Sequence, residues 1–347
     1  MWYTSIMEHI KVSSKHKEYT SVFWQQYFKN RSVGVLDIET TGLSRERCHF
    51  ILGGLYDPQE STLHQIFADH IEEEAEALAA FMELTERFDV VVTYNGRHFD
   101  LPFLAERIHR TGRGRREGAT VLPYSGYDLD LYQVVNGHSP IRRLLPNLRQ
   151  KTVESYMGLW TDRSDEISGA ESVELYMHYM QTKDPEARRQ ILLHNSDDVL
   201  QLTRLIPVIE KSDFHRAMHR MGFPAGSPEL RWQVRQIRFQ KDRIGVEGTQ
   251  GGRRISYRGY QLGEFPMHTL FDAKAGSFQM EIPIVRQGGI AAVDLRIAGI
   301  DEKKFEKYPG FGSGFLVVED RDGVKYREVN LMVQEIIALF EESIKWN

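Results

Sequence analysis

The chain has 347 residues, of which 41% are hydrophobic and 27% charged, a balance that excludes a wholly disordered protein and supplies a sizeable core. Its 44 basic and 49 acidic residues give a net charge of −5, so overall charge gives no support for nucleic-acid binding. The single cysteine, Cys48, excludes a disulfide scaffold and a cysteine-rich zinc module.

The N-terminal segment 1–30 is predicted to form an amphipathic lead-in helix that carries Trp24, Tyr27 and Phe28. Charged residues interrupt this segment, so it lacks the apolar stretch of a signal peptide. The sequence contains no run of about 18 apolar residues of the kind that spans a bilayer. We therefore expect a cytoplasmic protein with no membrane partner.

Residues 31–211 carry the pattern of an α/β domain. Apolar, β-branched runs predict strands at 33–39, 50–58, 63–69 and 89–95, and helical spacing predicts helices at 72–87 and 99–110. A strand leading into a helix is expected at 127–135, and helices at 144–204 with breaks at 161–169 and at Asp184-Pro185. This order predicts one mixed sheet flanked by helices.

The composition changes after Pro207. Glycine and proline residues between 222 and 228 predict a linker over 212–230. Beyond it lie short alternating strands, a hairpin signal at Asp322-Gly323 and a final amphipathic helix with Asn330 as a possible N-cap. Residues 231–347 are therefore predicted to form a smaller antiparallel β domain with a C-terminal helix.

Two acids, Asp37 and Glu39, lie two residues apart at the C-terminal end of the first strand of the α/β domain. Because strand side chains alternate, both carboxylates are expected on one face of the sheet. Two adjacent anions repel each other, and a shared divalent cation would relieve that repulsion. Two solvated acids at a strand end are the alternative interpretation.

Two later elements supply further acids. Asp100 follows the tight turn Asn95-Gly96 and lies in the first turn of a helix, where the helix dipole alone also favours an acid. His194 and Asp198 are four residues apart and share one face of a late helix, as ordinary surface pairs and buried histidines also do.

These elements together predict a metal site, because a sheet can bring strand one, the turn after strand four and a late helix to one point. Ligands that are all oxygen atoms select Mg²⁺ or Mn²⁺ over Zn²⁺. Two such ions would assist an in-line phosphoryl displacement. Histidine is a side chain suited to proton transfer near neutral pH, so His194 could take the proton of the attacking water.

Three motifs in order carry a resemblance to a known family: DIETTGL at 37–43, YNGRHFDLP at 94–102 and HNSDDVL at 194–200. They resemble the DEDD (DnaQ-like) 3′–5′ exonucleases, which have a ribonuclease-H-like fold and use two metal ions. CHF at 48–50 and LPNLRQKTVESYMG at 145–158 resemble the YprB-type ribonuclease-H-like proteins more closely. The resemblance covers about residues 31–210.

The resemblance implies that the catalytic residues are Asp37, Glu39, Asp100, His194 and Asp198, of which the four carboxylates would hold the two ions. One departure concerns the general base. The family has a tyrosine four residues or a histidine five residues before the last aspartate, whereas His194 lies four residues before Asp198. His194 thus stands in the position of the tyrosine.

Candidate substrate-binding residues come directly after the first two acids, within the second motif, and between the second and third motifs. The resemblance places Thr40, Thr41, Gly42 and Leu43 at the terminal nucleotide, with Leu43 against its base, although Leu43 could equally pack in the core. Asn95 belongs to the second motif. Lys151, like Arg149 nearby, could contact phosphates or be an ordinary exposed helix charge.

The predicted function is a metal-dependent 3′–5′ exonuclease that hydrolyses phosphodiester bonds in single-stranded nucleic acid or at the 3′ ends of DNA or RNA with two Mg²⁺ or Mn²⁺ ions. The alternatives are a non-catalytic nucleic-acid-binding or adaptor protein on the same scaffold and a structure-specific endonuclease. Residues 231–260 carry eight basic against two acidic residues. This segment could grip nucleic acid, and the β domain could instead bind a protein partner.

Overall fold

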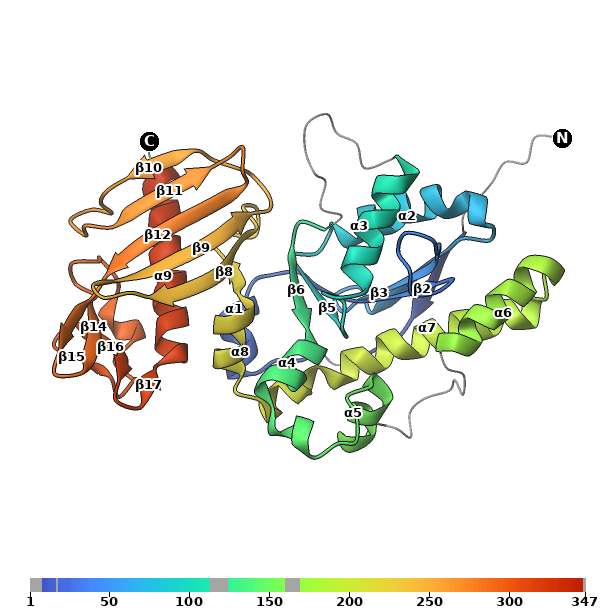
Figure 1. Ribbon diagram of the computed structural model, residues 1–347, viewed down its shortest axis with the longest axis horizontal. Helices are drawn as coiled ribbons and strands as arrows, with labels where there is room; N and C mark the ends of the chain where they lie inside the picture. The colour runs from blue at the N-terminus through green and yellow to red at the C-terminus, as the bar shows by residue number, and fades with distance from the viewer. Residues whose placement is uncertain (1–7, 17, 113–123, 160–168, 346–347) are drawn as a thin grey trace. The chain divides into compact units, whose positions relative to one another are not determined.

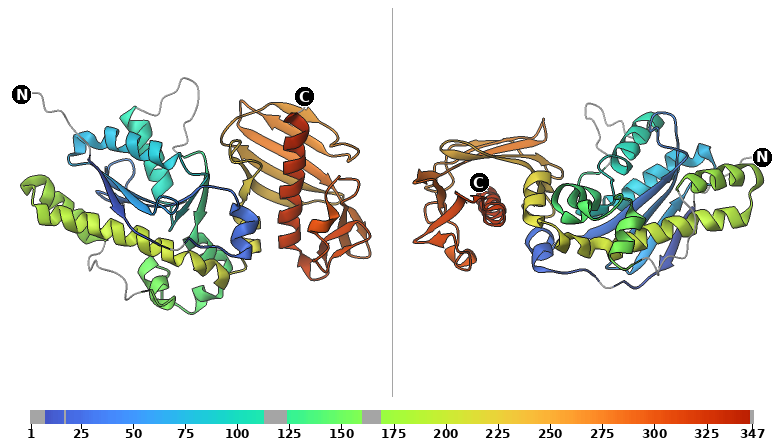
Figure 2. Two further views of the ribbon diagram at one scale, coloured as in Figure 1. Left: turned by 180° about the vertical axis from the view of Figure 1, so that it is seen from behind. Right: turned by 60° about the horizontal axis from the view of Figure 1, so that its bottom comes forward.

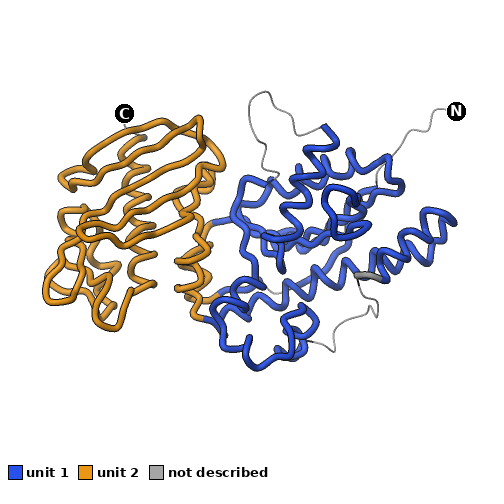
Figure 3. Tube along the Cα trace, in the orientation of Figure 1, with its two compact units in different colours: residues 1–20, 31–212 blue, residues 21–30, 213–347 orange. Residues whose placement is uncertain are grey.

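The computed structural model describes residues 8–16, 18–112, 124–159 and 169–345. The chain divides into two compact units (Figure 3). Unit 1 comprises residues 1–20 and 31–212, and unit 2 comprises residues 21–30 and 213–347. None of the described helices is long and apolar enough to cross a membrane.

Unit 1 is built on a six-stranded mixed sheet in the order β1-β4-β3-β2-β5-β6 (Figure 1). Its strands are β1 (Glu8–Ser13), β2 (Val33–Thr40), β3 (Phe50–Asp57), β4 (Thr62–Phe67), β5 (Val90–Thr93) and β6 (Tyr127–Asp130). The pairs β2/β5 and β5/β6 are parallel, and the others are antiparallel. The predicted mixed sheet is confirmed.

The helices of unit 1 cover both faces of this sheet (Figure 1). They are α2 (Glu74–Thr85), α3 (Asp100–Thr111), α4 (Leu131–His138), α5 (Gln150–Tyr156), α6 (Gly169–Thr182) and α7 (Pro185–Leu205), with 3₁₀ turns at Ile71–Glu73, Pro140–Arg143 and Ile206–Lys211. Two adjacent glycines of β3 face opposite sides of the sheet and show which helix covers each side. A Cβ atom at Gly53 would meet the ring of Phe81 on α2, and one at Gly54 would meet Asn195 on α7. Helices α2 and α7 therefore lie on opposite faces.

Unit 2 contains two antiparallel sheets and a long C-terminal helix, which lies against the larger sheet (Figure 2). Its helices are α1 (Val22–Phe28), α8 (Phe214–Met221) and α9 (Tyr326–Lys345), with a 3₁₀ turn at Glu302–Lys304. The larger sheet contains β7 (Phe223–Ala225), β8 (Trp232–Phe239), β9 (Arg243–Gln250), β10 (Tyr257–Gly259), β11 (His268–Asp272) and β12 (Ser277–Pro283); the smaller contains β13 (Val285–Gln287), β14 (Ile290–Asp294), β15 (Phe311–Gly312), β16 (Phe315–Asp320) and β17 (Gly323–Val324). Phe271 stacks on Phe340 of α9 with ring centroids 4.7 Å apart, so aromatic packing joins the larger sheet to the helix.

The N-terminal segment differs from the single helix expected over 1–30. Residues 8–13 form the edge strand β1, and among the described residues of this segment, 8–16 and 18–30, the helix covers 22–28. Helix α1 belongs to unit 2, where the Tyr27 hydroxyl accepts a hydrogen bond from Asn330 Nδ2 at 2.9 Å. The chain therefore contributes residues 21–30 to unit 2 after forming β1 and before forming the other strands of unit 1.

Two further expectations for unit 2 need correction. The segment 212–230, expected to be a linker, forms α8 and β7, because its apolar residues such as Phe214 and Phe223 are fully buried. Asn330 is not an N-cap, since α9 begins at Tyr326. Asn330 is instead a fully buried residue within the helix.

Candidate metal centre at the end of strand β2

The first two acids lie on the face of the sheet that α7 covers. In the antiparallel pair β2/β3, Asp37 is opposite Gly54 and Glu39 is opposite Leu52. Side chains of opposed residues point to the same face. Gly54 faces α7, so strand alternation places both carboxylates under that helix, as the sequence predicted.

Glu39, His194 and Asp198 form a compact cluster that could hold a metal ion. One ligand atom from each side chain lies within 4.8 Å of the others. His194 Nε2 is 3.7 Å from Glu39 Oε1 and 3.6 Å from Asp198 Oδ2. Ser172 of α6 donates its hydroxyl hydrogen to Glu39 Oε2 at 3.3 Å. The helix spacing of His194 and Asp198 thus brings both side chains to the buried Glu39.

Asp37 is held by two residues that the sequence analysis did not single out. Asn195 Nδ2 lies 3.3 Å from Asp37 Oδ2 and donates to it. Gln65 of β4 donates to Asn195 Oδ1 at 3.1 Å and to the Leu192 carbonyl at 2.8 Å, which fixes the orientation of the amide. The available signal was the polar Gln65 within the apolar strand β4. A buried polar side chain needs partners, and here they lead to the acidic site.

Asp100 reaches the same strand from the start of α3. Its Oδ1 accepts a hydrogen bond at 3.2 Å from the backbone N–H of Ile38, the residue between Asp37 and Glu39. The loop before α3 is held by Asp130, which accepts from the N–H groups of Asn95 at 2.9 Å and Arg97 at 3.3 Å. Asn95 has φ 68°, a left-handed conformation that asparagine tolerates in tight turns.

The acids repel one another strongly. Burial, and then the neighbouring charges of Asp100, Asp198 and Glu39, raise the pKa of Asp37 well above its usual range, and the Asn195 hydrogen bond offsets only part of this. Burial also raises the pKa of Asp100 to about 8, although the hydrogen bond from the Ile38 N–H acts in the opposite direction. Carboxylates that disfavour ionisation in this way fit a bound divalent cation, because the cation would stabilise their charged forms.

The loop that follows β2 carries the predicted substrate contacts. Thr40 donates its hydroxyl hydrogen to the Gly42 carbonyl at 2.9 Å, and Thr41 Oγ1 accepts from the His49 N–H at 2.8 Å. Leu43 is 85% exposed and therefore does not pack in the core. An apolar side chain so exposed on this loop is available to a ligand.

Lys151 lines a hollow on the surface of unit 1. The hollow has a volume of about 470 Å³ and is lined by Leu145, Pro146, Lys151, Thr152, Ser155 and Tyr156. Gln150, the residue before Lys151, donates from Nε2 to the backbone carbonyl of Asp198 at 3.0 Å.

The basic segment 231–260 of unit 2 is partly neutralised by ion pairs. Arg238 lies 3.1 Å from Glu247, and Arg243 lies 2.7 Å from Glu281. The pair with Glu281, which lies outside 231–260, offsets one positive charge, whereas Glu247 is already counted among the two acids of the segment.

The comparison with protein-family models agrees with the α/β architecture of unit 1. The family model of the RNase_H superfamily matches residues 35–209, which is just over half of the chain. Among solved structures, the family B DNA polymerase from the hyperthermophilic archaeon Pyrobaculum calidifontis is similar, with 16% identity and a TM-score of 0.40. That match covers 58% of this chain but only 28% of the polymerase chain. A search of curated proteins found no significant match.

Proposed function

This chain belongs to the RNase H superfamily, and we propose that it is a metal-dependent 3′–5′ exonuclease of the YprB type. One observation carries the proposal: the end of β2 gathers Asp37 and Glu39 with Asp100 of α3 and the His194/Asp198 pair of α7. Burial and then the neighbouring acids raise the pKa of Asp37, which favours a site that is completed by cations.

The four carboxylates are proposed to hold two Mg²⁺ or Mn²⁺ ions, because hard cations of this kind prefer oxygen ligands. When bound, such ions would acidify the attacking water and neutralise charge on the leaving 3′ oxygen. Asn195 holds one oxygen of Asp37, which leaves the other oxygen for a ligand. The Ile38 N–H orients the Asp100 carboxylate in the same way.

His194 is proposed to take the proton of the attacking water at Nε2. This atom lies between Glu39 Oε1 and Asp198 Oδ2, at 3.7 and 3.6 Å, so a water beside either carboxylate is within its reach. The two carboxylates would stabilise the imidazolium that forms. His194 is almost fully buried, which keeps bulk water from competing for that proton.

The substrate is proposed to be a single strand or a 3′ end of DNA or RNA. Leu43 presents an exposed apolar surface on the loop after β2, where a terminal base could pack. Lys151 lines a surface hollow, its neighbour Gln150 bonds the Asp198 carbonyl of α7, and its ammonium group suits a backbone phosphate.

The direction of cleavage tests this proposal. Two 5′-labelled oligonucleotides that differ only in a blocked 3′ end are incubated with the wild type, Asp37→Asn and Glu186→Gln. Glu186 is an exposed acid in the first turn of α7, where it pairs with Arg189. It lies on the same helix as Asp198 but several turns before it, so it is the matched control. We expect the wild type and Glu186→Gln to shorten only the free 3′ end, and Asp37→Asn to be inactive. Cleavage of the blocked substrate would identify an endonuclease instead.

A further inference from the structure

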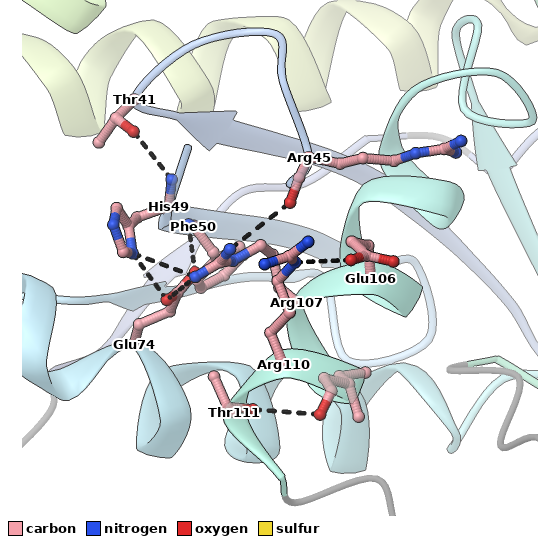
Figure 4. Close-up of polar contacts among 10 residues, drawn as sticks. Thr41, Arg45, His49, Phe50, Glu74, Glu106, Arg107, Arg110 and Thr111 are labelled. Carbon is pink, nitrogen blue, oxygen red and sulfur yellow. Dashed lines mark hydrogen bonds and ion pairs between the residues drawn. The ribbon is translucent and has the colours of Figure 1, made fainter. Parts of the chain in front are cut away.

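A second buried polar cluster lies outside the acidic site, between helices α2 and α3 and the loop 41–49 (Figure 4). Glu74 is the first residue of α2, and its carboxylate accepts the N–H of Phe50 at 2.8 Å. Arg107 of α3 donates to both Glu74 oxygens, from Nε and Nη2, at 2.7 Å each. His49 Nδ1 lies 2.9 Å from Glu74 Oε2, and Arg107 Nη1 donates to the Arg45 carbonyl at 3.5 Å.

Glu74 and Arg107 are both charged although both are buried. Burial acts to raise the pKa of the Glu74 carboxyl, but the hydrogen bonds from Arg107, Phe50 and His49 lower it overall. A buried ion pair of this kind is a weak source of stability, because apolar side chains of similar volume would often serve as well. The other polar contacts of the Glu74/Arg107 pair described above go to Arg45, His49 and Phe50. The pair therefore holds the C-terminal part of the loop 41–49 in place.

The loop 41–49 is closed at its base and folded within. The Thr41 N–H donates to the His49 carbonyl at 2.9 Å, and the His49 N–H donates to Thr41 Oγ1 at 2.8 Å. The Cys48 N–H donates to the Ser44 carbonyl at 2.7 Å. Leu43 is the exposed apolar residue of this loop, with 85% of its surface exposed, and Arg45, Glu46 and Arg47 are exposed charged residues beside it. The loop is thus an ordered support for one exposed apolar side chain.

We propose that Glu74, Arg107 and His49 form a positioning network, which fixes the loop 41–49 so that Leu43 meets the terminal base of the substrate. The inference rests on the proposed nuclease function. Strand β2 carries Asp37 and Glu39 and leads directly into the loop, and β3 starts at Phe50, where the loop ends. Because Glu74 holds the Phe50 N–H, the network fixes the position of Leu43 relative to the acids. None of its residues contacts substrate, so they act on binding through Leu43 rather than on the reacting atoms.

The test compares Arg107→Lys with Arg110→Lys in the full chain. Lysine keeps the charge of Arg107 but cannot donate to both Glu74 oxygens and to the Arg45 carbonyl together. Arg110 lies one turn further along α3 and pairs only with the exposed Glu106 among the contacts drawn in Figure 4, so it is the matched control. If the loop then occupies its binding geometry a tenth of the time, KM for a 3′-ended oligonucleotide rises about tenfold and kcat stays unchanged.

Hydrogen exchange of the 41–50 amides gives a measure that does not depend on activity. We expect faster exchange and a higher KM in Arg107→Lys, neither in Arg110→Lys, and the same KM for the double variant Arg107→Lys/Leu43→Ala as for Leu43→Ala alone. His49→Leu, which leaves the Glu74/Arg107 pair intact, replaces Arg107→Lys if that variant does not fold.

Three results would overturn the inference: unchanged exchange, faster exchange with unchanged KM, or additive effects of Arg107→Lys and Leu43→Ala. A wild type that cleaves no substrate would instead refute the proposed function itself. The two failures are therefore distinguished by the wild-type assay.

Discussion

The adjacent glycines of β3 allow the link between packing and the acidic site to be tested with two equal substitutions. In Gly54→Ala, the new methyl carbon would lie 2.2 Å from Asn195 Oδ1 and 2.9 Å from Val199 Cγ2, so α7 must shift. In Gly53→Ala, it would lie 2.5 Å from the Phe81 ring on the opposite face, so α2 must shift instead. Both changes add one methyl group to the same buried strand.

The expected loss of stability follows from the clash and the broken contacts. Overpacking a core costs about 1–3 kcal/mol, and replacing glycine within a strand recovers roughly 0.5–1 kcal/mol. In Gly54→Ala, the displaced Asn195 also loses hydrogen bonds to Gln65 and Asp37, at about 1 kcal/mol each. We expect Tm to fall in both variants, by roughly 5–10 °C for Gly54→Ala and less for Gly53→Ala.

The assay is a Mn²⁺ titration by calorimetry below the Tm of both variants. Gly54→Ala moves Asn195 away from Asp37, so its Mn²⁺ affinity should fall about 10–100-fold, as when the hydrogen-bond partner of a metal ligand is lost. Gly53→Ala should bind Mn²⁺ like the wild type. Equal affinity in the two variants would refute the claim that α7 positions Asp37 through Asn195.

The remaining predictions concern separate parts of the chain. Asn195→Leu removes the hydrogen bond to Asp37 without adding volume to β3, and should weaken Mn²⁺ binding about 10–100-fold by calorimetry; unchanged binding would contradict the role of Asn195. Asp37→Asn relieves the repulsion that raises the pKa of Asp37, so without metal its Tm at pH 8 should exceed that of the wild type. Burial lowers the pKa of His215 and His219 to about 4, so the unfolded chain binds more protons between pH 6.5 and 4. Unit 2 is therefore expected to lose stability as pH falls through this range, by on the order of 3 kcal/mol for each ring. Urea unfolding followed by fluorescence measures this loss. An equal free energy of unfolding at pH 7 and pH 4.5 would contradict the prediction. Lys151→Ala should raise KM and reduce the salt dependence of substrate binding by about one ion, whereas an unchanged salt slope would exclude a phosphate contact.

The pairs Asp37/Glu39 and His194/Asp198 were predictable because the spacing within each pair depends on local geometry, whereas Asp100 meets Ile38 from 62 positions away. Strand alternation is enough to place Asp37 and Glu39 on one face, and helix periodicity is enough to place His194 beside Asp198. Gln65 and Asn195 were not predictable, because their hydrogen bond joins residues 130 positions apart. Only the folded sheet shows that they lead to Asp37.

The errors in the fold have the same origin. Strand β1 is exposed on nearly every residue, and its apolar alternation consists of Ile10 and Val12 alone, so its backbone pairing with β4 defines it. Asn330 resembles an N-cap by residue type, but the helix already starts at Tyr326. Its amide is instead bonded inside unit 2, to the Tyr27 hydroxyl and to the His215 carbonyl. Burial of that amide depends on packing between distant segments, which residue type does not encode.

The arrangement of the chain also affects how unit 2 can be studied. Residues 21–30 belong to unit 2 although they precede the main strands of unit 1. A truncation after residue 212 would expose the aromatic side chains of α1, which are buried in the full chain. Substitutions within the full chain are therefore the cleaner test of what unit 2 contributes.

The central claim is that the acids gathered at the end of β2 form a metal-dependent nuclease site. The most direct measurement incubates the full chain with 5′-labelled DNA and RNA oligonucleotides that carry 3′ overhangs, in Mg²⁺, Mn²⁺ or EDTA, beside Asp198→Ala. We predict a ladder that shortens from the 3′ end in the presence of Mg²⁺ or Mn²⁺, and no cleavage in EDTA or by Asp198→Ala. Cleavage by Asp198→Ala at the wild-type rate, or a wild type that binds the oligonucleotides and cleaves none of them with either metal, would contradict the claim.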